Sequence, residues 1–99
     1  MTVERRSEYV AECFWPGVSE TDLRALDERL EAVVAGLGAT GSDVRYVGSL
    51  LMRQDEVVLC VFEGSEHAVR AAAERAQVPF ERILETARSP WPPACRPTT

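Results

Sequence analysis

Lysine is absent from this sequence of 99 residues, so all eleven basic side chains are arginines, and the formal net charge is −5. An acidic chain gains no attraction from a phosphate backbone, so we expect no nucleic-acid partner. No apolar run approaches the roughly 20 residues of a membrane helix, and no apolar segment follows the charged N-terminus as it does in a secretion signal. We therefore expect a cytoplasmic protein without a membrane association.

Cysteine and histidine are scarce as well. The three cysteines are Cys13, Cys60 and Cys95, too widely spaced for a CxxC unit, and His67 is the single histidine. This pattern favours free thiols in a reducing compartment over a disulfide framework. The sequence also lacks a Ser/His/Asp or Cys/His arrangement, a phosphate-binding glycine loop and an internal repeat. It therefore does not define a reaction.

The periodicity of apolar residues predicts four strands and two helices in one small domain. The expected strands are Ser7 to Trp15, Val44 to Met52, Glu56 to Glu63 and Phe80 to Ala87. In the second strand we expect Val44, Tyr46, Gly48 and Leu50 to share one side. The third strand is apolar on both faces from Val57 to Phe62, which predicts a central position in the sheet.

Capping residues and apolar stripes define the two predicted helices. Ser19 and Asp22 form a capping box, and Gly36 and Gly38 are expected to end the first helix. Its inner stripe comprises Leu23, Leu26, Leu30, Val33, Val34 and Leu37, and its charged residues, Asp27 and Arg29 among them, are expected to face water. Ser65 caps the second helix, from Glu66 to about Gln77, with Val69, Ala72, Ala73 and Ala76 inside.

This element order predicts an α+β fold of the ferredoxin-like βαββαβ kind. Right-handed crossovers give an antiparallel sheet in the order 4-1-3-2, with two helices on one face. We assign residues 1–88 to this domain and residues 89–99 to a Pro-rich C-terminal tail that contains Trp91 and Cys95. The second face of the sheet is then bare and partly hydrophobic, so we expect a homodimer that buries it.

Five segments resemble a known family when taken together and in order. They are Tyr9 to Gly17, Val44 to Ser49, Asp55-Glu56, Cys60 to Glu63 and Val78 to Ile83. They look like the small bacterial ferredoxin-like proteins typified by a nickel-responsive, nickel-binding member, most of which have no assigned activity. The resemblance implies a ferredoxin-like homodimer and, as a cofactor, nickel or another divalent metal. Cys13 departs from the family pattern, which usually has a basic residue there.

Glu12 is the most informative single residue, because it lies in a strand that we expect to be central in the sheet, between Val10 and Phe14 on the same face. A carboxylate in such a place needs a partner. One interpretation is a structural pairing with Arg45, Arg82 or a backbone group. The other is that Glu12 lines a pocket and binds a ligand or acts as a general base. Arg45 and Glu63 are further candidates for ligand binding.

The candidate metal ligands are His67, Glu63 and Cys13. Glu63 closes the third strand and His67 follows about one turn later, so both are expected to face a common ligand near the start of the second helix. Imidazole, carboxylate and thiolate are all ligands of divalent transition metals. Cys13 is expected to behave as a small core residue or to face the dimer seam.

Three functions remain open on the sequence alone. The first is a homodimeric binding protein for a metal ion or a small ligand. The second is an enzyme of the dimeric α+β barrel kind, with Glu12 performing acid-base chemistry in a pocket between sheet and helices. The third is a non-catalytic interaction module, for which the Pro-rich tail is the only indication.

Overall fold

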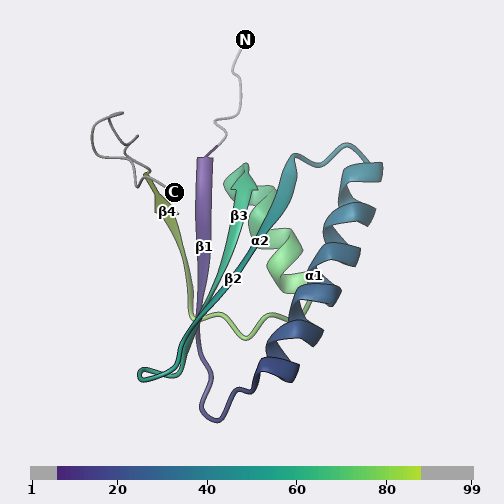
Figure 1. Ribbon diagram of the computed structural model, residues 1–99. Coiled ribbons are helices and arrows are strands. Elements are labelled where there is room, and N and C mark those ends of the chain that lie inside the picture. Colours follow the sequence, from purple (N-terminus) through teal and green to yellow (C-terminus); the bar gives the residue numbers. More distant parts are fainter. Residues whose placement is uncertain (1–6, 88–99) are drawn as a thin grey trace, which may run out of the picture.

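The computed structural model describes residues 7–87, and the proposed tail, with Trp91 and Cys95, lies outside them. Its four strands form one antiparallel sheet in the order β2-β3-β1-β4, which is the predicted ferredoxin-like order read from the other edge. Figure 1 shows both helices on one face of this sheet. The elements are β1 (Ser7–Phe14), α1 (Glu20–Ala39), β2 (Val44–Met52), β3 (Val57–Gly64), α2 (Glu66–Arg75) and β4 (Arg82–Thr86).

The predicted capping box starts α1. The Ser19 hydroxyl accepts a hydrogen bond from the Asp22 N–H at 3.0 Å, and the Asp22 carboxylate accepts one from the Ser19 N–H at 3.0 Å. Both bonds satisfy N–H groups that the first turn of a helix leaves unpaired. The predicted apolar stripe faces the sheet, with Leu26, Leu30 and Leu37 buried.

The end of α1 corrects one prediction, because the helix continues through Gly36 and Gly38. Its termination comes at Gly41, whose φ of +88° is in the left-handed region that favours glycine. The Ser42 N–H donates to the Leu37 carbonyl at 3.0 Å, and the Gly41 N–H donates to the Gly38 carbonyl at 3.1 Å. This pair of bonds is the Schellman arrangement, so the glycine just beyond the helix ends it rather than the glycines within it.

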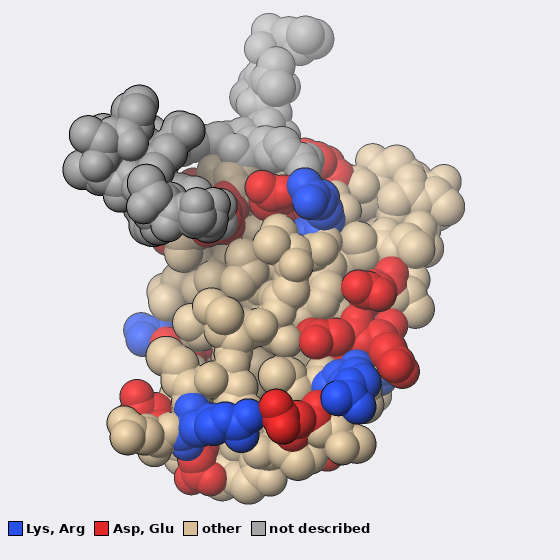
Figure 2. All heavy atoms as spheres, in the orientation of Figure 1, with Lys and Arg blue, Asp and Glu red and all other residues tan. Residues whose placement is uncertain are grey.

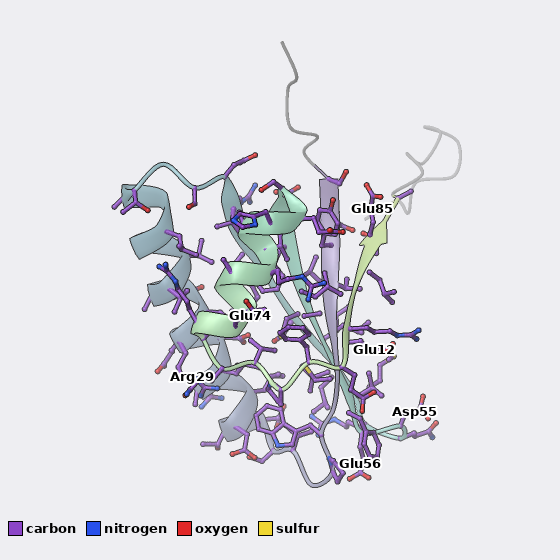
Figure 3. The ribbon with its side chains drawn as sticks, turned by 180° about the vertical axis from the view of Figure 1, so that it is seen from behind. Glu12, Arg29, Asp55, Glu56, Glu74 and Glu85 are labelled. Carbon is purple, nitrogen blue, oxygen red and sulfur yellow. The ribbon has the colours of Figure 1, made fainter. Side chains whose placement is uncertain are left out.

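The second helix packs through small side chains. Ser65 caps it by accepting from the Ala68 N–H at 3.2 Å, and the predicted inner residues Val69, Ala72, Ala73 and Ala76 are all buried. Arg29, expected to face water, reaches from α1 to the end of α2 and donates through Nε to the Ala76 carbonyl at 3.1 Å. Figure 3 shows this approach of Arg29 toward the last turn of α2, near Glu74. The bond joins the two helices.

The faces of β2 also differ from the prediction. A register irregularity falls between Tyr46 and Gly48, so that Val47 has no partner on β3. Val44 and Tyr46 pack toward the helices, whereas Gly48 and Leu50 lie on the bare face. A single extra residue inverts the alternation of side chains beyond it, and a local sequence pattern carries no sign of this.

The remaining strands keep their predicted faces. Tyr9, Ala11 and Cys13 of β1 are buried under the helices, and β3 is central with neighbours on both sides. The last strand is shorter than expected, because it begins at Arg82 rather than Phe80, but Ile83 packs against the core as predicted. Between residues 7 and 87, neither helix is long and apolar enough to cross a membrane.

Candidate functional site

The face of the sheet without helices, here called the open face, is largely apolar. Pleating and register place Val10, Leu59 and Val61 near its centre. Figure 2 shows this side of the molecule, with uncharged side chains over its middle and charged ones mostly toward its margin. Its most exposed members are Phe14 at 52%, Leu50 at 59%, Met52 at 41% and Leu84 at 36%. The hydrophobic open face that the sequence predicted is therefore present.

Glu12 lies on the open face and is paired with Arg82. The two residues are opposite each other in β1 and β4, and Arg82 Nε donates to Glu12 Oε1 at 2.7 Å. The Glu12 side chain is 26% exposed and that of Arg82 is 62% exposed. Figure 3 shows Glu12 on the side of β1 that borders β4. Of the partners that the sequence suggested for Glu12, the structure therefore shows Arg82.

The exposure of this ion pair limits its contribution to stability. We expect Glu12→Gln to lower the free energy of unfolding by less than about 1 kcal/mol, because solvent screens the charge on Arg82. Urea denaturation of Glu12→Gln, Arg82→Gln and the double variant measures the coupling between the two side chains. A loss above roughly 2 kcal/mol in Glu12→Gln would contradict this account and show that Glu12 has a second structural partner.

Arg45 and Glu63 form a second ion pair at one end of the open face. They are opposite each other in β2 and β3, and Arg45 Nη1 lies 3.0 Å from Glu63 Oε1. Glu8 of β1 is the next residue along this row, and Thr86 Oγ1 donates to its Oε2 at 2.9 Å. The row is therefore polar, with two carboxylates on neighbouring strands beside an arginine and a hydroxyl.

The candidate metal ligands do not come together. Glu63 lies on the open face, His67 is exposed in the first turn of α2 on the opposite side, and Cys13 is fully buried beneath the helices. The expectation that Cys13 faces a seam on the open face is wrong, because β1 turns this side chain inward. Across residues 7–87, no group of three or more His, Cys, Asp and Glu side chains is placed to hold a metal ion.

A polar cluster between α1 and β2 was missed in the sequence. The hydroxyls of Tyr46 and Ser49 both donate to Asp27 Oδ1, the latter at 2.8 Å. Burial, followed by the bond to Asp27, raises the pKa of Tyr46 well above its ordinary value. Asp27 follows Leu23 by four residues and precedes Leu30 by three, so its position beside the apolar stripe was the available signal.

Comparison with known proteins agrees with this fold and sequence pattern. Residues 9–86 match the family model described as nickel responsive protein SCO4226-like. The crystal structure of SCO4226 from Streptomyces coelicolor A3(2) is similar with a TM-score of 0.69 and 20% sequence identity, over 85% of this chain and 100% of that one. A search of curated proteins gives no match. Since the family model covers most of the chain, this protein belongs to the SCO4226-like family of nickel-responsive proteins.

Proposed function

We propose that the chain is a cytoplasmic homodimeric binding protein in which two open faces pack together and a ligand is held at their seam. The observation that carries the proposal is the apolar open face, with Phe14, Leu50 and Leu84 exposed on a sheet whose other face is already covered. Large exposed apolar patches on small proteins mark interaction sites. The free thiols of Cys13 and Cys60 support a reducing compartment.

The distribution of charge supports a second copy as the occupant. The two described ion pairs of the face, Glu12 with Arg82 and Arg45 with Glu63, are already neutralised within the chain. The apolar centre carries no charge that a copy would repel. At Gly48 no atom lies within 4 Å of the position of a side chain, which leaves space for a side chain of the other copy. An apolar centre with a polar rim is the usual anatomy of a protein interface.

Nickel or another divalent ion enters this proposal as a property of the assembled dimer. The described residues of one chain do not fit a metal site, because they bring no three donors together. The carboxylates of Glu8, Glu12 and Glu63 lie on the open face, where packing against a copy adds the same three groups from the partner. Carboxylate oxygens bind divalent cations, and two chains together offer more of them than one.

Catalysis by Glu12 has less support than binding. The enzyme hypothesis placed Glu12 in a pocket between sheet and helices, but Glu12 lies on the other face of the sheet with its carboxylate engaged by Arg82. Glu81 is a neighbouring carboxylate, since it precedes Arg82 and donates its N–H to the Glu12 carbonyl at 2.8 Å, but it does not free the Glu12 carboxylate from Arg82. The interaction-module hypothesis depended on residues 89–99, which lie outside the described structure.

Sedimentation of Leu50→Asp tests the dimer. Leu50 is 59% exposed, so a monomer should tolerate the change, whereas an unpaired carboxylate in the seam should weaken association by roughly 2 to 5 kcal/mol. We expect the wild-type protein to sediment as a dimer at micromolar concentration and Leu50→Asp as a monomer. Ala25→Asp, on the exposed side of α1, is the matched control and should stay dimeric.

Calorimetric titration with Ni²⁺ then separates the two parts of the proposal. We expect binding to wild type and to Ala25→Asp, and weaker or no binding to monomeric Leu50→Asp, because each copy supplies only part of the donor set. A monomeric wild-type protein would refute the proposed assembly. A wild-type dimer that does not bind Ni²⁺ would support the proposed assembly and refute nickel as its ligand.

A further inference from the structure

Two free thiols share the interior of the molecule, on the side of the sheet away from the open face. Cys13 of β1 and Cys60 of β3 are both fully buried, and both point toward the helices. Cys60 is opposite Ala11 and Cys13 is opposite Val58, so the two cysteines are diagonal neighbours on the two central strands. Neither has a role in the proposed function.

This register places the two thiols next to each other on the buried face of the sheet. A hydrogen bond from Cys60 lowers the pKa of Cys13, and the same bond, together with burial, raises the pKa of Cys60. The two cysteines are therefore buried neighbours on adjacent strands and face the same side of the sheet.

The spacing of this pair is better suited to a bridging ion than to a disulfide. Diagonal residues on antiparallel strands have Cα atoms about 7 to 8 Å apart, whereas a disulfide requires less than about 7 Å. Ions that need four ligands are also unsuited, because no third His, Cys, Asp or Glu side chain joins the two sulfurs among residues 7–87. Two thiolates alone suit soft monovalent ions of the Cu⁺ class.

We propose that Cys13 and Cys60 form a buried two-thiolate site for a soft monovalent metal ion of the Cu⁺ and Ag⁺ class. Binding breaks two S–H bonds, forms two metal–sulfur bonds and releases two protons to water, with no change in oxidation state. The ion enters when the helix layer opens locally, as buried sites do in native proteins. The site lies across the sheet from the proposed dimer seam, so either can fail without the other.

Native mass spectrometry with Ag⁺ tests the site. The reduced full-length chain carrying Cys95→Ser is used, so that the third thiol cannot bind the probe. We expect one Ag⁺ per chain at stoichiometric metal, and loss of the bound ion in the same chain with Cys13→Ala or with Cys60→Ala. Circular dichroism establishes that each variant is folded.

Val58→Ala is the matched control, since it removes buried volume from the same face of β3 without removing sulfur. It should keep its Ag⁺. Absence of silver from the folded Cys95→Ser chain overturns the proposal without reference to any cysteine-to-alanine variant. Retention of silver after Cys13→Ala overturns it too, because one buried thiol is not the proposed site.

Discussion

Replacing Gly64 with alanine is expected to lower the free energy of unfolding by roughly 3 to 5 kcal/mol, the largest loss expected for alanine at any of the six glycines. Gly64 ends β3 with a φ of +147°, a conformation that other residues rarely adopt. A Cβ at this position would lie 2.2 Å from the Asp43 carbonyl oxygen and 2.9 Å from the Val44 Cα. Both neighbours are backbone atoms, so no side-chain rotation relieves the clash.

Gly48 is a matched control for this substitution, because it has almost the same φ in a different environment. Its φ is +148°, but nothing lies within 4 Å of the position of its Cβ. In the Leu50→Asp background, where the open face is not packed against a second copy, Gly48→Ala should therefore cost only the backbone strain, roughly 1 to 3 kcal/mol. Urea denaturation of both variants measures the two free energies. Equal losses would show that the contact with Asp43 and Val44 is not the cause.

The close approach at Gly64 also positions α2. The Ser65 N–H donates to the same Asp43 carbonyl at 3.1 Å, so the start of β2, the end of β3 and the cap of α2 meet at one point. Because Gly64 has no side chain, the chain can leave the sheet there and cross to the helical layer. A residue with a Cβ would hold β2 away from this junction.

The fold could be predicted because its signals are local and mutually consistent. The alternating residues of β1, the apolar stripe of α1 and the caps at Ser19 and Ser65 each specify an element without reference to the rest of the chain. The right-handed crossover rule then leaves few arrangements of four strands and two helices. The apolar run in β3 added that this strand is central.

The prediction of the fold was wrong at two places where a single residue determines which of two backbone geometries forms. In β2 the bulge at Val47 reverses the faces of Gly48 and Leu50, and nothing in a strand pattern specifies such an insertion. In α1 the sequence offered three glycines near the end of the helix. Only Gly41 has the positive φ that stops the helix, and this depends on the bonds that Ser42 makes after the turn.

The candidate site, too, could be predicted only in part. The need of Glu12 for a partner could be predicted, because a charged residue between apolar neighbours in a central strand is visible in the sequence. Arg82 was among the candidate partners and is the one that the structure shows. The metal set failed for a different reason. Glu63 and His67 are close in sequence, but Gly64 and Ser65 carry the chain from one side of the sheet to the other. Distance along the chain did not reveal this change of layer.

Asp27 was predicted to face water because it is charged, although it lies beside the apolar stripe of the helix. The structure shows why a carboxylate is tolerated there, since β2 brings the hydroxyls of Tyr46 and Ser49 to the same oxygen. These partners are far from Asp27 in sequence, and their approach depends on the faces of β2. An error in one strand therefore concealed a cluster on its neighbouring helix.

Stability is expected to decrease at alkaline pH because of Tyr46. The pKa of Tyr46 is raised in the folded protein, whereas a tyrosine in the unfolded chain has a pKa of about 10. Above about pH 10 the unfolded chain therefore releases a proton that the folded chain retains. The folded state binds more protons, so the free energy of unfolding falls as pH rises, by up to about 1.4 kcal/mol for each pH unit above this value.

Tyr46→Phe removes the titrating phenol and should flatten this decline, although at neutral pH it costs about 1 kcal/mol through the lost bond to Asp27. Ser49→Ala is the control, because it removes the other hydroxyl on the same carboxylate but keeps the phenol. The raised pKa of the Cys60 thiol also lowers stability at alkaline pH, but both variants retain Cys60. Urea denaturation from neutral to alkaline pH compares the slopes. If the stability of Tyr46→Phe declines with pH as steeply as that of wild type, ionisation of the half-buried Tyr46 phenol is not the cause of the alkaline loss of stability.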